Sequence, residues 1–161
     1  MRAVKILASL IMLLIFAPGT RAQTCDGIGQ TPSSAFPVCG TQTFTQESVP
    51  ICGHTPIPGP VCTSFDNGPH LDTNPYWYKF TCYADGTRAF KITPKVMTDD
   101  YDWQLFDVTG RNPNDVYTDL SLYVSMNWSG EPGVTGASAE GNSFDVCGGR
   151  GQPLFSKAAT L

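Results

Sequence analysis

Basic residues and histidine are scarce in this sequence, and their scarcity excludes several classes of partner. The 161 residues include 10 Lys and Arg, 14 Asp and Glu, and 2 His. A protein that binds nucleic acid or an anionic lipid surface needs clustered positive charge, which this chain lacks. We therefore expect no nucleic-acid partner, and the acidic balance favours cations or simply solubility.

Long apolar runs are also absent, apart from one near the N-terminus. That run, residues 6–16, is shorter than the roughly 20 residues that a membrane-spanning helix needs. Arg2 and Lys5 precede it, and the small-x-small sequence of residues 20–22 follows it, as in a secretory signal. We predict that residues 1–22 are a signal peptide and that the mature chain has no membrane span. Removing this leader leaves 7 of the 10 basic residues, and hence a net charge of about −7.

The short motifs of common catalytic and metal sites are missing as well. The sequence contains no GxSxG, no HExxH and no CxxC. It therefore offers no nucleophile elbow, no zinc-protease helix and no thioredoxin-type cysteine pair. His54 and His70 lie in turn-rich segments, without a Glu or a second His at metal-ligand spacing. A Ser–His–Asp triad assembles in space, so the sequence leaves that alternative open, but we predict a protein that is not an enzyme.

What the chain does contain is an even number of cysteines, all of them after the leader. In an oxidising compartment six cysteines imply up to three disulfides, for which 15 pairings exist. One hypothesis pairs Cys25 with Cys39, Cys52 with Cys62, and Cys82 with Cys147. The candidate disulfide residues are Cys25, Cys39, Cys52, Cys62, Cys82 and Cys147.

The chain after the leader divides into two regions of different composition. Residues 23–70 are rich in proline and glycine and include seven prolines. Proline removes a ladder donor, so we expect an irregular or edge-strand region here, stabilised by disulfides. Residues 71–161 instead contain alternating apolar and polar runs, and we treat them as one folded domain.

Those alternating runs predict β-strands. We expect strands near residues 76–83, 88–93, 101–108, 122–128 and 143–147. An Asp-Gly turn at residues 84–87 predicts a hairpin between the first two, and residues 129–142 form a long connection. No window has a helical period with caps. The predicted fold class is therefore all-β, an antiparallel jelly-roll-like β-sandwich.

Several segments together resemble a known family. They are SFDNGPHLDTNPYWYKFTC, DDYDWQLFDVTGRNPNDVYTD, SLYVSMNWSGEPGVTGAS and PLFSKAATL, which lie within residues 60–161. They resemble a domain near the N-terminus of large exported proteins of Bacteroidetes. Those proteins carry PKD- or Ig-like repeats and a sorting domain associated with gliding motility or type IX secretion. The layout is also distantly similar to pre-peptidase C-terminal and CUB-like jelly-roll domains.

The resemblance carries two implications for this chain. In the family, the segment that corresponds to residues 153–161 leads into further strands, so we expect the sandwich to be incomplete at its C-terminus. The family also implies downstream domains in the same polypeptide. A complete small protein is the alternative.

Two clusters of side chains are candidate binding sites. Asp99, Asp100 and Asp102 supply carboxylate oxygens, which calcium prefers, although they lack EF-hand spacing and also suit solvated turns. Trp77 and Tyr123 are the aromatic residues that strand alternation places outward, as a platform for a sugar or a peptide. The alternative is that these aromatic side chains belong to the core.

The resulting hypothesis is a non-catalytic module of an exported protein at the outer-membrane surface or in the extracellular space. It would serve adhesion, display, or contact with an extracellular glycan or protein. It requires no cofactor, with calcium as the one cation that its carboxylates suit. The alternative is an accessory, calcium-stabilised domain of a secreted hydrolase whose catalytic part lies outside this chain.

Overall fold

The computed structural model describes residues 25–40, 43–62 and 70–161, and within them the regular structure is all-β. The predicted signal peptide and residues 63–69 lie outside the described residues. The described part contains strands and 3₁₀ turns but no α-helix. The strands are β1 (Phe36–Pro37), β2 (Pro56–Ile57), β3 (His70–Leu71), β4 (Tyr78–Lys79), β5 (Thr87–Arg88), β6 (Phe90–Ile92), β7 (Trp103–Phe106), β8 (Tyr123–Asn127), β9 (Thr135–Ser138), β10 (Asp145–Val146), β11 (Phe155–Lys157) and β12 (Ala159–Thr160). The 3₁₀ turns are η1 (Pro32–Ser34), η2 (Pro113–Tyr117) and η3 (Leu120–Leu122).

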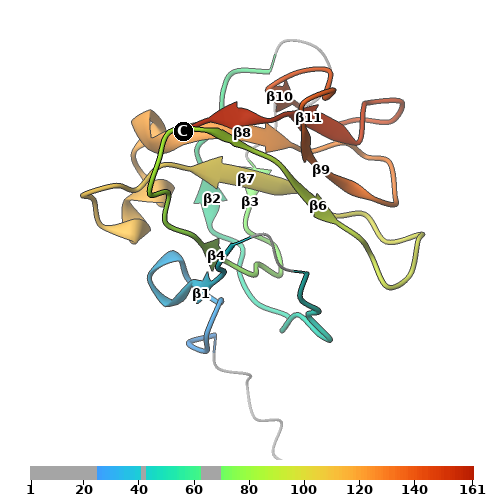
Figure 1. Cartoon of the computed structure of the whole chain (residues 1–161). Coiled ribbons are helices and arrows are strands. Elements are labelled where there is room, and N and C mark those ends of the chain that lie inside the picture. The colour runs from blue at the N-terminus through green and yellow to red at the C-terminus, as the bar shows by residue number, and fades with distance from the viewer. Residues whose placement is uncertain (1–24, 41–42, 63–69) are drawn as a thin grey trace, which may run out of the picture.

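Two three-stranded sheets form the centre of a sandwich-like fold (Figure 1). Their strand orders are β10–β8–β7 and β11–β9–β6. Trp103 on β7 meets the ring of Phe90 on β6 at 4.8 Å between centroids, and its indole N–H donates to Thr135 on β9. The core therefore lies between these sheets, and the predicted all-β class is confirmed. The same described residues contain no long apolar helix of the kind that spans a bilayer.

Strand β8 is buried on both of its faces. Met126 and Asn127 are neighbours that point to opposite faces, and both are fully buried. The Asn127 face meets Ser156 on β11, and the opposite face lies toward the Pro56–Pro60 segment. We predicted a half-buried strand from the alternation of residues 121–128, which is wrong because small polar residues fill the second face.

Strand pairing is mixed rather than purely antiparallel. Strands β7 and β8 pair antiparallel as adjacent elements, with Trp103 opposite Asn127. Three other pairs are parallel: β1 with β4, β10 with β8, and β11 with β9. Parallel partners need long connections, so they leave no local signal in the sequence.

The predicted hairpin across residues 84–87 is wrong. Strand β4 pairs with β1, β5 pairs with β12, and β6 pairs with β9. The two predicted strands therefore belong to different sheets, and Gly86 instead exchanges backbone hydrogen bonds with Leu161. A local turn preference contributes less to the stability of the fold than the pairing of whole strands with distant partners.

The predicted connection 129–142 hides a strand, β9, at the centre of its sheet. Its sequence is Thr-Gly-Ala-Ser, which lacks the large β-branched and aromatic residues that mark strands. Gly136 explains the composition, because a Cβ atom there would lie 2.2 Å from the Phe90 carbonyl oxygen. The close approach of β6 requires glycine. The last predicted strand, 143–147, is confirmed as β10.

The disulfide pairing differs from our hypothesis in every bond. Cys25 is joined to Cys52, and Cys62 is joined to Cys147. The first bond closes the proline-rich front on itself, and the second ties that front to the end of β10. Cys39 and Cys82 are not disulfide-bonded in this structure. The pairing was not predictable because it follows which loops pack together, and sequence spacing does not determine that packing.

Candidate functional site

Four aromatic side chains gather at the surface of the small β1–β4 sheet, and we refer to them as the aromatic cluster. The ring of Tyr78 lies 5.2 Å from Phe44, 5.0 Å from Tyr76 and 6.5 Å from Phe36, between centroids. Phe36 is 37%, Phe44 49% and Tyr78 39% exposed. Rings at these separations contact one another, yet much of their area faces solvent. The members are Phe36, Phe44, Tyr76 and Tyr78.

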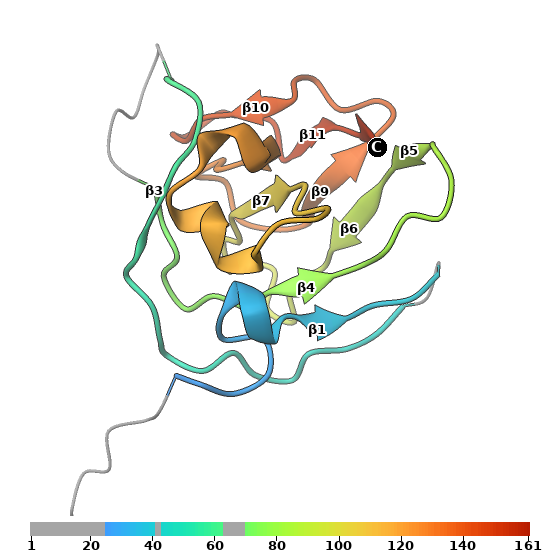
Figure 2. The ribbon, with the colours of Figure 1, turned by 90° about the vertical axis from the view of Figure 1, so that its left-hand side faces the viewer.

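Strand register places two of these rings together. Phe36 on β1 is the direct partner of Tyr78 on β4 in a parallel pair, and directly paired residues point to the same face. The backbone N–H of Phe36 donates to the Trp77 carbonyl at 2.8 Å, and that of Val38 donates to Lys79 at 2.8 Å. Figure 2 shows β1 and β4 side by side at one edge of the molecule.

Proline protects the free edge of β1. Phe36 and Val38 direct their N–H groups toward β4, so the residue between them directs its backbone outward. That residue is Pro37, which has no N–H to offer. The edge beside the aromatic cluster is therefore a poor template for a further strand, and side chains are left as its means of contact.

The hydroxyl group of Tyr78 remains protonated over the physiological range. Burial, followed by the neighbouring phenols of Tyr76 and Tyr101, raises the pKa of Tyr78 to about 12. A neutral phenol both donates and accepts hydrogen bonds. The cluster thus combines apolar ring faces with a polar, uncharged group.

The aromatic residues that we predicted as a platform lie elsewhere. Trp77 is half-buried, and its ring centroid lies 6.1 Å from that of Phe106 and 5.9 Å from that of Tyr117. Tyr123 is also half-buried, and its hydroxyl donates to Asp145. Burial and then that hydrogen bond raise the pKa of Tyr123. Both residues therefore belong to an inner aromatic layer.

Sequence reasoning missed the surface rings for an identifiable reason. Phe36 and Phe44 lie in the proline-rich front, which has no strand alternation to indicate a face. Strand β4 is only two residues long. Its Tyr78 side chain is exposed, whereas the side chain of the preceding Trp77 is half-buried. The dipeptide Phe36-Pro37 is the one local signal, because proline in a strand marks an edge.

The predicted calcium ligands lie at the surface, where neighbouring atoms still partly desolvate the Asp102 carboxyl group. Asp99, Asp100 and Asp102 all lie at the surface before β7. Among the described residues, no three His, Cys, Asp or Glu side chains are placed to hold one metal ion. Burial raises the pKa of Asp102 to about 7, with the charge of Asp100 as the second cause. Burial and then Glu131 raise the pKa of Asp100. Calcium binding stays a prediction from the sequence.

Asp102 gives a testable pH dependence. Its folded-state pKa of about 7 exceeds the ordinary 3.8, so between these values the folded state binds more protons than the unfolded state. The contribution of Asp102 to the free energy of unfolding therefore falls as pH rises from 4 to 8. We expect Asp102→Asn to raise the free energy of unfolding at pH 8 by about 1 kcal/mol, allowing for solvent screening, and to leave it unchanged at pH 4.

Urea unfolding at both pH values measures this difference. Asp107→Asn is the matched control of opposite sign, because hydrogen bonds from Thr109 lower the pKa of Asp107. That control should destabilise the protein at pH 8. An equal change for Asp102→Asn at pH 4 and pH 8 would contradict the assignment.

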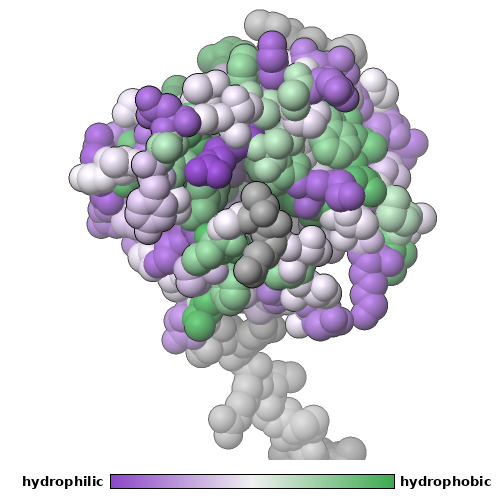
Figure 3. Space-filling model, viewed as in Figure 1, coloured by the Kyte–Doolittle hydropathy of each residue, from purple (hydrophilic) through white to green (hydrophobic). Residues whose placement is uncertain are grey.

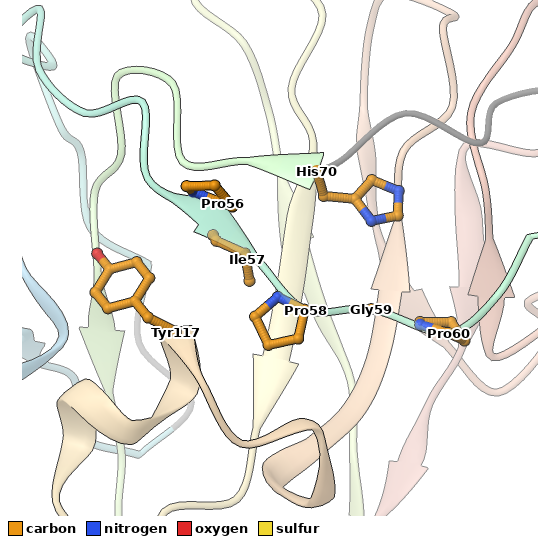
Figure 4. Close-up of a pocket in the computed structure, with 7 residues that line it drawn as sticks. All are labelled: Pro56, Ile57, Pro58, Gly59, Pro60, His70 and Tyr117. Carbon is orange, nitrogen blue, oxygen red and sulfur yellow. The ribbon is translucent and has the colours of Figure 1, made fainter.

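A hollow of about 380 Å³ lies on another part of the surface. Figure 4 shows His70 and Tyr117 on opposite sides of the Pro56–Pro60 segment that lines it. The Tyr117 hydroxyl donates to the buried Asp72 at 2.8 Å, and burial and then this bond raise the pKa of Tyr117. The ring of His70 packs on Trp128 at 4.4 Å. The Tyr117 hydroxyl and the His70 ring already interact with Asp72 and Trp128 inside the protein. The hollow is therefore a weaker candidate site than the aromatic cluster.

Comparisons of this chain with protein-family models, curated proteins and solved structures found no match. On the face drawn in Figure 3, hydrophobic and hydrophilic residues are interspersed, and neither kind forms a continuous band. The compact group of contacting, partly exposed aromatic rings is therefore a stronger candidate site than the hollow.

Proposed function

We propose that this chain is a non-catalytic module of an exported protein and that it contacts an extracellular glycan or protein through the aromatic cluster. The observation that carries the proposal is the set of mutually contacting, half-exposed rings of Phe36, Phe44, Tyr76 and Tyr78. Exposed aromatic groups are costly in water unless a partner covers them. The signal-like leader and the two disulfides support export.

The chemistry of the cluster favours a carbohydrate. Flat ring faces pack against the apolar faces of sugar rings, while a neutral phenol exchanges hydrogen bonds with hydroxyl groups. Tyr78 supplies both kinds of contact, since its pKa of about 12 keeps it uncharged.

Binding measurements on the full exported chain test this proposal. We expect Tyr78→Ala and Phe44→Ala each to weaken binding of the best glycan ligand about tenfold or more, because each removes a stacking surface worth about 1.4 kcal/mol. A glycan array identifies that ligand, and isothermal titration measures its affinity.

Tyr83→Ala is the matched control. Tyr83 is an aromatic residue of the same region, is 94% exposed, and makes no ring contact with the cluster. Its replacement should leave affinity unchanged. Equal losses for Tyr83→Ala and Tyr78→Ala, or no response to any glycan or extracellular protein, would overturn the proposal. Binding to a protein but to no glycan would replace the carbohydrate as the ligand class.

A further inference from the structure

We propose that Cys39 and Cys82 form a third disulfide in the exported protein and that this bond joins the two strands carrying the aromatic cluster. Neither cysteine is disulfide-bonded in the structure, where Cys39 is exposed and Cys82 is half-buried. The inference rests on the export in our proposed function, because only an oxidising compartment forms and keeps such a bond. It does not depend on the ligand of the aromatic cluster.

Strand register brings these two cysteines to the same end of the sheet. Phe36 is opposite Tyr78 and Pro37 is opposite Lys79, and the Val38 N–H still donates to the Lys79 carbonyl at 2.8 Å. Continuing that register places Cys39 opposite Thr81, one residue from Cys82. In an ideal parallel ladder, with strands about 4.8 Å apart and a rise of about 3.3 Å per residue, two Cα atoms offset in this way would be about 6 Å apart. Disulfides have Cα atoms about 5.5 to 6 Å apart.

The end of the ladder removes the one geometric obstacle. In a regular ladder, residues offset by one would point to opposite faces. The paired strands end at Pro37 and Lys79, however, so both cysteines lie beyond the pleated part. Gly40 follows Cys39 directly with φ of +65°, which marks a turn in the backbone there.

Arg88 contacts both Cys82 and the nearby Phe80, just beyond the end of β4. The Arg88 Nε–H donates to Cys82 Sγ at 3.2 Å, and the Arg88 guanidinium also lies 5.8 Å from the ring centroid of Phe80. Arg88 belongs to β5, which pairs with β12. Cys82 is therefore held by a second sheet, and Cys39 is the exposed partner of the proposed bond.

The chemistry is ordinary thiol–disulfide exchange. The Cys39 thiolate attacks the disulfide of an oxidoreductase in the exported compartment and forms a mixed disulfide. The Cys82 thiolate then displaces the enzyme, so the two thiols lose two protons and two electrons. The oxidoreductase disulfide is reduced to its dithiol and accepts those electrons.

Peptide mapping without reduction tests the pairing. Cleavage at Lys and Arg releases residues 80–88, in which Cys82 is the only cysteine, whereas Cys39 lies in peptide 23–79 and Cys147 in peptide 112–150. We expect the exported wild-type chain to have no thiol that reacts with maleimide after denaturation, and peptide 80–88 to be linked to 23–79. The variant Cys39→Ser should release peptide 80–88 with one maleimide on Cys82. The double variant Cys39→Ser/Cys82→Ser should have no free thiol.

Each other outcome overturns the inference. Two maleimides on wild-type chain, at Cys39 and Cys82, would show that both remain thiols although the other disulfides have formed. A covalent dimer that Cys39→Ser abolishes would show a bond between chains. Six reactive thiols in a chain that stays in the cell would contradict export, and with it the proposed function. These results are distinguishable, because only the last one affects the other two disulfides.

Discussion

Replacing Cys62 and Cys147 together by serine is expected to lower the free energy of unfolding by about 4 to 5 kcal/mol. The bond closes a loop with a sequence separation of 85, and a longer loop loses more entropy in the unfolded chain when it is closed. Because Cys62 follows the Pro56–Pro60 segment closely, the bond also anchors that segment. The segment packs tightly: a Cβ atom at Gly59 would lie 2.9 Å from His70 Nδ1 and 3.4 Å from Gln104 Nε2. Without the bond, this cover over β7 and β8 is held by packing and by the pairing of β2 with β3.

Urea unfolding of the double variant and of wild type measures the loss. The matched control is Cys25→Ser/Cys52→Ser, which opens a loop of separation 27 and should cost about 3.5 kcal/mol. The order of the two losses is the specific prediction. A larger loss for the shorter loop would show that local packing around Cys25, and not loop entropy, dominates.

Replacing Asn127 by alanine is expected to destabilise the protein by about 3 to 4 kcal/mol, since it leaves several buried polar groups without partners. The Asn127 amide donates to the Pro153 carbonyl and to the Ser156 hydroxyl, each at 3.1 Å, and its oxygen accepts from the Ser129 N–H at 3.1 Å. Ser156 in turn donates to the Met126 carbonyl at 2.7 Å. This network joins β8 of one sheet to β11 of the other.

Asn127→Asp separates hydrogen bonding from volume. The carboxylate has nearly the same shape but cannot donate when ionised, and it would face the Pro153 carbonyl in a buried site. Its destabilisation should therefore be larger at pH 8 than at pH 4. Asn142→Ala, at an exposed asparagine, should change the free energy of unfolding by less than about 0.5 kcal/mol. A small, pH-independent effect of Asn127→Asp would mean that the network does not hold the sheets together.

Local patterns in the sequence predict individual strands, whether or not those strands pair with their neighbours in the chain. The run from Tyr101 to Val108 and the run from Leu122 to Trp128 are confirmed as β7 and β8, which pair antiparallel. Alternation is a local signal, so it survives without knowledge of the fold. The same reasoning misses β9, because glycine has a low strand propensity. Gly136 is required at this position by the close approach of β6, which leaves no room for a Cβ atom.

The candidate site was predictable in kind but not in its residues. The aromatic content of the chain indicates an aromatic group at the surface or in the core, and both are present. Trp77 and Tyr123 contact Phe106 inside, whereas Tyr78 contacts Phe44 outside. Which ring is exposed depends on the parallel partner of β4, and that partner is β1, some forty residues earlier in the sequence.

The sequence by itself determined the all-β class, the two-part composition of the chain and an even set of cysteines, because alternation, proline content and residue counts are local properties. The tertiary structure alone decided which strands pair, which cysteines meet and which aromatic rings reach the solvent. Those outcomes follow from contacts between segments far apart in the chain, and such contacts depend on how whole sheets pack against each other.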